Sequence, residues 1–518
     1  MGPSESQLRR VFALLGVMIV SLDARGSTLP SANRSGGVIA KSLTHGAPTG
    51  PDVAFPSTPA GAAATAWLRA VNDDSPEETL AFYRTYFSKP LLDQRSAENR
   101  RDHAHIVRVT EGRVHVRSIE RASETQVVAV LETERTETWV RLTIEVDPSS
   151  PNVIVRSDAE VIGPPTHVPR DDRDATVILD GYVTRMCDRG IFSGAVAVAR
   201  GGVVVYERAC GLASRAFGVS NRVDTKFNLG SMNKMFTAVS IAQLVEAGKL
   251  AYGDTLARAW PEYPNHAVAE RITIHQLLTH TSGLGDYFTE EYTRTSKDRL
   301  RAIKDYLPLF VDEPLTFEPG TRFQYSNAGF MVLGGVVQHV SGQDYFDYVR
   351  EHVYTPAGMK STDAFEMDHD TPNLAIGYTL DRATPGAPLD LNKLRNNLYL
   401  HVVKGGPVGG GFSTVGDLVS FGDALFRGRL VSPEQVAMLT TSRGSSNSAY
   451  AYGFDVGAFD GQREVGHSGG FDGINAHLSV FPDSGLSIAG MANMDPPAAG
   501  RICVLARNLF ARRRDGGP

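Results

Sequence analysis

The sequence contains few cysteines and no recognisable metal-binding pattern. Its three cysteines, Cys187, Cys210 and Cys503, are too few for a disulfide scaffold, and their spacing matches no zinc site. It also has no H-E-x-x-H motif and no His and Asp cluster with ligand spacing. We therefore expect neither a metal nor another cofactor.

An excess of basic charge is also lacking. Lys and Arg number 52 against 58 Asp and Glu, which gives a net charge of -6. Such a chain has no global field for a phosphate backbone, so nucleic-acid binding is not expected. Hydrophobic residues at 42% and charged residues at 21% exclude a fibrous or wholly disordered chain. A length of 518 residues predicts two or three domains.

The N-terminal region contains a short hydrophobic segment. The apolar run at residues 11–22 rises about 18 Å as a helix, whereas a bilayer core is about 30 Å thick. Arg9 and Arg10 precede the run and small residues follow it at 24–26, so residues 1–26 are predicted to be a cleaved signal peptide for export to the periplasm or outside the cell. The alternative is an uncleaved membrane anchor. Residues 27–59, rich in Ser, Pro, Gly and Thr, are predicted to be a flexible linker.

Residues 60–162 are predicted to form a small α+β unit. Apolar residues between 67 and 87 suit two short amphipathic helices. Alternating segments then predict antiparallel strands, at 114–119, 126–131, 138–146 and 153–161. No nucleophile–base motif occurs here, so we expect packing, substrate delivery or homo-oligomer formation from this unit.

Residues 172–515 are predicted to form a second, larger α+β unit. It opens with a helix and a hairpin and closes with another hairpin and a final helix. The expected fold is an antiparallel sheet built from both ends of this unit, with a long helical insertion between them.

A serine followed by a lysine opens a helical pattern in this insertion. Lys234 lies three residues after Ser231, on the same helix face, so its amine can reach the serine. A serine hydroxyl needs an adjacent base to act as a nucleophile. Lysine can serve if burial and neighbouring positive charge lower its pKa. The alternative is a helix-capping serine and a surface lysine.

A tyrosine and an asparagine form a second motif before another helix. Tyr325 could relay a proton between Ser231, Lys234 and a leaving group, and a nearby ammonium would lower the pKa of its phenol. Asn327 could hold Lys234 and donate to a substrate carbonyl. The alternative is a core tyrosine and a turn asparagine.

A glycine-rich stretch before the closing hairpin is the third motif. His467 and Gly469 are expected to line the cleft and position the substrate, and the backbone N–H groups of Gly470 and Ser231 to form an oxyanion hole. The stretch also matches G-x-S-x-G around Ser468. That motif needs a strand, a sharp turn and then a helix, whereas a hairpin follows here, so Ser468 is not the expected nucleophile.

The three motifs, in this order, resemble those of the serine β-lactamase and penicillin-binding protein superfamily. The resemblance covers most of 172–515 and is closest to class C β-lactamases, family VIII carboxylesterases and D-aminopeptidases. It implies that Ser231 is the acylated nucleophile, Lys234 and Tyr325 the acid/base pair, and Asn327 a positioning residue. His280, in the supporting stretch 277–283, is expected to belong to a structural turn.

One departure from the family bears on the substrate. Class C β-lactamases have Lys-Thr-Gly where this chain has His467-Ser468-Gly469, and histidine is only partly charged at neutral pH. This favours small esters, amides or short peptides as substrates. Association with the cell envelope is a separate expectation. A β-lactamase or acyltransferase is the alternative, and a non-catalytic ligand-sensing or structural protein is the alternative of another class. Cys187 and Cys210 could pair after export, whereas Cys503 is expected to be buried.

Overall fold

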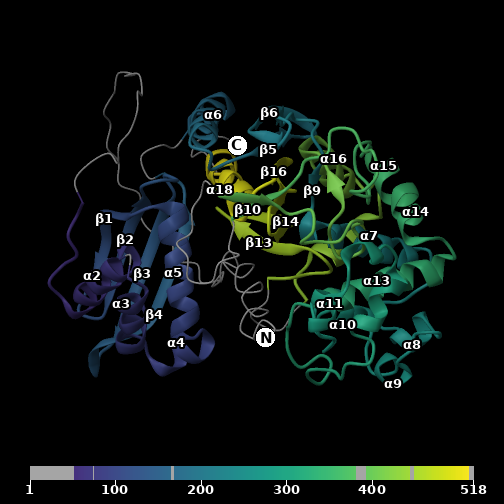
Figure 1. Ribbon diagram of the computed structural model, residues 1–518, viewed down its shortest axis with the longest axis horizontal. Helices are drawn as coiled ribbons and strands as arrows, with labels where there is room; N and C mark the ends of the chain where they lie inside the picture. Colours follow the sequence, from purple (N-terminus) through teal and green to yellow (C-terminus); the bar gives the residue numbers. More distant parts are fainter. Residues whose placement is uncertain (1–51, 74, 165–168, 381–392, 444–448, 513–518) are drawn as a thin grey trace. The chain divides into compact units, whose positions relative to one another are not determined.

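The computed structural model describes residues 52–73, 75–164, 169–380, 393–443 and 449–512 (Figure 1). The chain divides into two compact units, with the break between residues 166 and 167. The predicted signal peptide, at 1–26, and most of the predicted linker lie outside the described residues. Among the residues that are described, no helix is both long enough and apolar enough to cross a membrane.

In its described residues, the first unit has four helices followed by four strands. The helices are α2 (Pro59–Asn72), α3 (Pro76–Tyr86), α4 (Lys89–Gln94) and α5 (Ala97–Glu111). Side chains of Thr58, Ser75 and Ser96 cap three of them by accepting hydrogen bonds from backbone N–H groups in the first turn. The sequence predicted only two helices, because α5 buries just Ala97 and Ala104 and so has little apolar periodicity.

The strands of the first unit form an antiparallel sheet in chain order. They are β1 (Val114–Ala122), β2 (Gln126–Thr133), β3 (Trp139–Asp147) and β4 (Ser150–Ile162), at the predicted positions. The N–H of Val53 donates to the carbonyl of Val116 at 3.0 Å, and Asp52 pairs with Arg117 at 3.3 Å. The last residues of the predicted linker, 52–58, therefore contact the sheet.

The second unit is built on a six-stranded antiparallel sheet with the order β13-β14-β15-β16-β5-β6. Its strands are β5 (Gly194–Arg200), β6 (Val203–Cys210), β13 (Asp455–Phe459), β14 (Gln462–Phe471), β15 (Ile474–Phe481) and β16 (Leu486–Ala492). Strand β5 pairs with β16, nearly 300 residues later in the chain. This confirms the predicted sheet from both ends of the unit.

Helices cover both faces of this sheet. On one face α6 (Asp172–Asp188) and α18 (Ala498–Phe510) pack against Val196, Val198 and Ile488. On the other face α7 (Asn233–Glu246), α13 (Asn327–Ser341) and α16 (Val415–Phe426) belong to the core that contains Ala197 and Ala489. Because side chains alternate along a strand, one sheet serves two separate cores.

Short elements complete the insertion. The shorter helices are α8 (Leu256–Ala259), α9 (His266–Ala269), α10 (Ile274–Leu278), α11 (Glu290–Arg294), α12 (Ile303–Tyr306), α14 (Tyr345–Val349), α15 (Thr355–Ala357) and α17 (Pro433–Thr440). Two-stranded ribbons join β7 (Leu212–Ser214) to β8 (Val219–Ser220), β9 (Phe227–Asn228) to β12 (Phe412–Ser413), and β10 (Tyr378–Leu380) to β11 (Leu394–Asn396).

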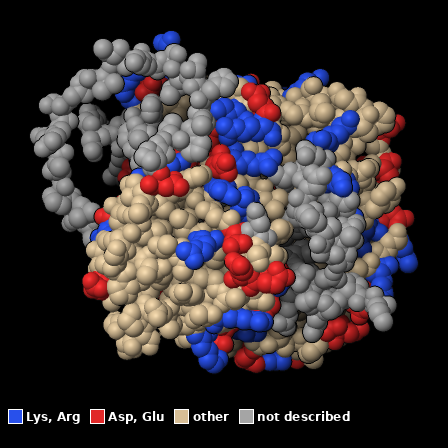
Figure 2. Space-filling view, turned by 60° about the vertical axis from the view of Figure 1, so that its left-hand side comes forward, with Lys and Arg blue, Asp and Glu red and all other residues tan. Residues whose placement is uncertain are grey.

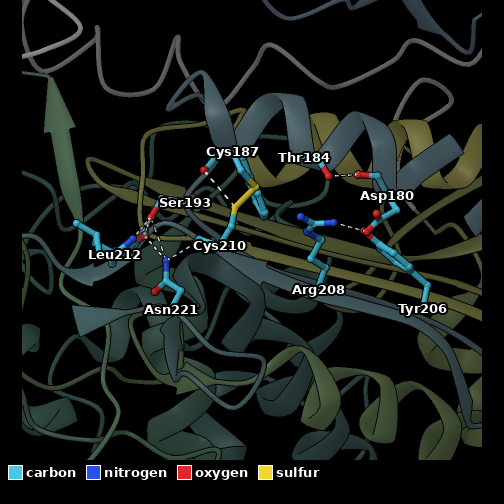
Figure 3. Close-up of a disulfide and its surroundings, with 11 residues drawn as sticks. Asp180, Thr184, Cys187, Ser193, Tyr206, Arg208, Cys210, Leu212 and Asn221 are labelled. Carbon is cyan, nitrogen blue, oxygen red and sulfur yellow. Dashed lines mark hydrogen bonds and ion pairs between the residues drawn. A yellow bond between two sulfur atoms is a disulfide. The ribbon is translucent and has the colours of Figure 1, made fainter. Parts of the chain in front are cut away.

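A disulfide joins Cys187, on α6, to Cys210, at the end of β6 (Figure 3). Asp180 of the same helix also binds two side chains of β6, accepting from Arg208 at 2.5 Å and from Tyr206 at 3.2 Å. The sequence left open whether these two cysteines pair, and the structure shows that they do. Cys503 is buried in α18, also as predicted.

Charges of both signs share the surface. On the face drawn in Figure 2, Lys and Arg side chains lie among Asp and Glu side chains rather than in a patch of one sign. The first unit has several exposed ion pairs, such as Arg141 with Glu120 at 2.8 Å and Arg156 with Asp158 at 2.5 Å. Charge alone therefore gives the drawn face no preference for a polyanion.

Candidate active site

Ser231 lies in a single helical turn, η2 (Gly230–Met232), that leads directly into α7. The turn depends on Gly230, which has a φ of 51°, and a Cβ there would lie 2.8 Å from the backbone nitrogen of Gly470. Asn228 fixes the entry to the turn by accepting a hydrogen bond from the N–H of Gly230 at 2.9 Å. Ser231 itself stays partly exposed, at the start of a helix where negative charge is favoured.

Lys234 is fully buried one turn later. Its Nζ donates to Oδ1 of Asn327 and to the carbonyl of Val408, both at 2.8 Å. Burial lowers the pKa of this amine to about 7, although the charge of Asp286 acts in the opposite direction. Near neutral pH a large fraction of Lys234 is therefore uncharged and able to accept a proton.

Tyr325 links this lysine to the serine. The side chain of Ser231 acts to lower the pKa of its phenol, and Nζ of Lys234 lies 4.7 Å from the centre of its ring. Burial nevertheless raises the pKa of the phenol above its ordinary value. The predicted lowering was wrong because loss of water, together with the nearby carboxylates of Asp455 and Asp286, disfavours the phenolate more than Ser231 favours it. Tyr325 is therefore a protonated phenol, and Lys234 is the group that can take up a proton.

A partly buried carboxylate that the sequence motifs did not reveal completes this network. Asn327 accepts from Lys234 through Oδ1 and donates through Nδ2 to Oδ2 of Asp286 at 2.8 Å. Asp286 also accepts from the N–H of Phe288 at 3.2 Å. Burial raises the pKa of Asp286 to about 6, against the effect of these hydrogen bonds and of Lys234. Asn327 therefore holds the lysine as predicted, but one of its two amide hydrogens is committed to Asp286.

Aromatic side chains support Tyr325. His280 has a φ of 58° and accepts a hydrogen bond at Nδ1 from the N–H of Ser326 at 3.0 Å. Its ring lies 4.2 Å from the ring of Tyr325 and 4.8 Å from that of Tyr450. His280 thus occupies a structural turn, as predicted, and it also packs against the tyrosine of the site.

His467 lies on β14 and is buried and neutral. Burial, together with the smaller effect of the charge of Lys234, lowers its pKa to about 3. Nδ1 lies 2.5 Å from the carbonyl oxygen of Ser468, and Nε2 lies 3.1 Å from the hydroxyl of Tyr450. We assign the proton to Nδ1, which donates to the carbonyl, so that Tyr450 donates to Nε2. The expected partial charge on His467 was wrong, and this side chain provides no cation for a substrate carboxylate.

The glycines after His467 lie against the serine turn. Pairing between β13 and β14 ends at Gly466, so residues 467–471 pair with β15 alone. The unpaired edge of this segment lies against η2. The approach is so close that a Cβ added to Gly469 would lie 1.9 Å from the carbonyl oxygen of Leu229 and 3.0 Å from the nitrogen of Ser231. The backbone nitrogens of Ser231 and Gly470 thus meet at one rim, where the sequence predicted an oxyanion hole.

Ser468 faces away from this rim. Neighbouring residues of a strand point to opposite faces, so Ser468 lies on the α18 side of the sheet, while His467 lies on the α7 side. Its partner across the strands is His477, whose Nε2 lies 2.9 Å from the hydroxyl of Ser479. Because a hairpin rather than a helix follows Ser468, it does not form a nucleophile elbow.

Among the described residues, one group of side chains has the composition and spacing of a metal site. Ligand atoms of Glu366, Asp368 and His369 lie within 4.8 Å of one another. Arg301, however, pairs with Glu366 and, at 2.5 Å, with Asp368. Lys404 also pairs with Glu366, at 3.1 Å, so two cations already balance the two carboxylates.

The fold and these side chains define the class of protein, a serine hydrolase with a serine in the turn η2 and a buried lysine at the start of α7. The family model described as Beta-lactamase matches residues 178–509, more than half of the chain. The chain therefore belongs to the β-lactamase family, and the predicted superfamily and fold are confirmed.

Several known proteins are similar to this chain. Penicillin-binding protein 4* of Bacillus subtilis (strain 168) is 29% identical over 320 residues, which cover 59% of this chain and 68% of that protein. Esterase EstB of Burkholderia gladioli is 38% identical over 211 residues, 38% of this chain and 53% of that protein. The crystal structure of a penicillin-binding protein from Bacillus halodurans is 32% identical, with a TM-score of 0.57, and the match covers 63% of this chain and 100% of that chain.

Proposed function

We propose that this serine hydrolase cleaves an ester or amide bond through an acyl-enzyme formed on Ser231. The observation that carries the proposal is the buried Lys234, whose pKa of about 7 is suited to a base at neutral pH. Tyr325 lies beside both groups, because Ser231 acts on the pKa of its phenol and Nζ of Lys234 lies 4.7 Å from its ring centre. A merely structural lysine would be expected at the surface or paired with a carboxylate.

In the first step Oγ of Ser231 attacks the substrate carbonyl carbon. The hydroxyl proton passes through the phenol of Tyr325 to the neutral amine of Lys234, which becomes an ammonium. The carbonyl oxygen gains the negative charge, and the N–H groups of Ser231 and Gly470 bind it. In comparable sites each such donor contributes about 3 kcal/mol to the transition state.

In the second step the tetrahedral intermediate collapses and the bond to the leaving group breaks. The leaving alcohol or amine takes a proton from Tyr325, which recovers one from the ammonium of Lys234. Asn327 keeps the lysine aimed at the site throughout. The products of this half-reaction are the free alcohol or amine and an acyl ester of Ser231.

Deacylation reverses the proton path. Water attacks the ester of Ser231 while the regenerated base accepts its proton, and the serine oxygen leaves with a proton from Tyr325. The acid is released and the enzyme is restored. If another alcohol or amine replaces water, the same steps amount to acyl transfer.

The neutral His467 guides the choice of substrate. A side chain with a pKa of about 3 cannot hold the carboxylate that many β-lactams carry. The similarity to an esterase favours carboxylic esters, with amides of D-amino acids or short peptides as the related substrates. β-Lactam hydrolysis is the second candidate, supported by the family itself.

Export of the protein is part of this proposal. The disulfide between Cys187 and Cys210 supports it, because disulfides persist in oxidising compartments such as the periplasm and extracellular space. Association with the cell envelope and homo-oligomer formation through residues 60–162 stay predictions.

The proposal is tested with p-nitrophenyl esters, nitrocefin and D-amino-acid p-nitroanilides. Ser231→Ala should abolish turnover of the substrates that are cleaved, whereas Ser468→Ala should retain most of it. Circular dichroism confirms that both variants are folded. The opposite pattern would reassign the nucleophile, and a folded wild-type protein that neither turns over these substrates nor labels with a fluorophosphonate would support a non-catalytic role.

A further inference from the structure

Two phenyl rings form a parallel pair in the second unit. The ring centres of Phe288 and Phe471 are 6.1 Å apart and their planes differ by 18°. Both side chains are partly exposed. Phe288 packs against two buried tyrosines: its ring centre lies 4.6 Å from that of Tyr287 and 4.9 Å from that of Tyr292. The pair therefore has a rigid base and a partly exposed apolar surface of the kind that binds apolar ligand groups.

This pair adjoins the reacting centre from two sides. Phe471 directly follows Gly470 and, because side chains alternate, it shares the face of β14 that carries His467. Phe288 comes from the other side, where its N–H donates to Asp286, the partner of Asn327. The ring of Phe471 thus belongs to the segment that forms the predicted oxyanion hole, and the ring of Phe288 belongs to the segment that binds Asn327.

The proton path determines which end of the substrate lies near Tyr325 and which end extends along β14. The leaving group must lie near Tyr325, which returns its proton. The ring of Tyr325 lies 6.4 Å from that of Tyr450, whose hydroxyl contacts His467. Phe471 lies four residues beyond His467 on β14, which is about 13 Å along the strand. The acyl chain therefore extends away from Tyr325, toward the phenyl pair.

We infer that Phe288 and Phe471 bind the acyl portion of the substrate and select acyl groups with an apolar chain or ring. This inference rests on the acyl-enzyme mechanism proposed above. The neighbouring carboxylate of Asp286 adds to the selection, because it repels an anionic acyl group.

The test measures kcat/KM for p-nitrophenyl acetate, butyrate and hexanoate. In the wild type, each added methylene should raise kcat/KM about threefold to fourfold if the chain is buried against the rings. Phe471→Ala and Phe288→Ala should each lose about tenfold on the hexanoate and much less on the acetate. Phe288→Leu, which is less disturbing to the fold, should fall between the wild type and Phe288→Ala.

Two controls separate this inference from other effects. Phe459→Ala removes a partly buried phenyl from β13, which packs under Arg507 at 4.7 Å, and should leave the chain-length dependence unchanged. With butyryl esters of phenol, p-nitrophenol and ethanol, the ratio of wild-type to Phe471→Ala activity should be constant. A ratio that varies with the alcohol, or no dependence on acyl length in the wild type, would overturn the inference.

Labelling of Ser231 by a fluorophosphonate distinguishes the two proposals. If the wild type and both alanine variants label but show no preference for longer acyl groups, the inference fails and the acyl-enzyme proposal stands. If the folded wild type does not label, both fail.

Discussion

Replacing Asp286 with Asn should extend activity to lower pH. Lys234 must be neutral to act as the base, so activity is present above its pKa, about 7, and is lost as the pH falls through that value. The carboxylate of Asp286 favours the ammonium form of Lys234 and therefore raises this pKa. Asp286→Asn removes that charge, which lowers the pKa of Lys234 and moves the acidic limb of the pH–activity profile to lower pH.

The size of the shift follows from the geometry of the network. Asn327 lies between the two groups, with hydrogen bonds of 2.8 Å to each. The charges are thus about 7 Å apart, and their interaction is about 2.4 kcal/mol at an effective dielectric constant of about 20 and about 0.6 kcal/mol in bulk water. We expect a downward shift of about one pH unit, since one unit corresponds to about 1.4 kcal/mol.

The assay is kcat/KM for a p-nitrophenyl ester from about pH 5 to about pH 9, a range that spans the titration of Lys234. The groups that face Lys234 are Asp286, Tyr325, His280 and His467, and burial keeps both histidines uncharged across this range by lowering their pKa values. An unchanged or raised midpoint in Asp286→Asn, in protein that melts normally, would refute the reasoning.

Asp417→Asn is the matched control. Asp417 is also a carboxylate whose pKa is raised by burial, and it accepts hydrogen bonds from Ser361 and Thr362, both at 2.7 Å. It is not part of the hydrogen-bonded network of Lys234. Its replacement should lower the melting temperature without moving the midpoint of activity.

Three further changes have defined outcomes. Tyr325→Phe should lower kcat about 100-fold to 10,000-fold with little change in melting temperature, because it removes a proton-relay hydroxyl but keeps the ring. Gly469→Ala should lower kcat/KM at least about a hundredfold, since its Cβ would lie 1.9 Å from a backbone carbonyl oxygen. As a control, Gly253→Ala, with open space around it, should leave kcat/KM unchanged. Combined Cys187→Ser and Cys210→Ser should lower the free energy of unfolding in urea by about 3 kcal/mol, because the disulfide spans 23 residues; an unchanged value would show that the crosslink contributes nothing.

Local spacing was enough to predict most of the site. Ser231 and Lys234 share a helix face, and Asn327 begins the next long helix of the insertion. The pattern of the two hairpins predicted the sheet, because turn residues and alternation act over a few neighbouring positions. The helix α5, which buries few side chains, left no such pattern.

The rest of the site depends on contacts between distant segments. Asp286 lies in a loop outside every motif, and its role follows only from its hydrogen bond with Asn327, 41 residues later. Tyr450 contacts His467 and His280 from a third segment. The protonation of Tyr325 and His467 was mispredicted for a related reason. Burial dominates both pKa values, and burial is a property of the folded chain.

Trapping the acyl-enzyme tests the central claim most directly. The protein is mixed with a p-nitrophenyl ester, quenched in acid within the first turnover, digested and sequenced by mass spectrometry. The account predicts one acyl group per chain, attached to Ser231, and none in Ser231→Ala. An acyl group on Ser468 or any other residue, or turnover of the ester with no acyl group on the chain, would contradict it.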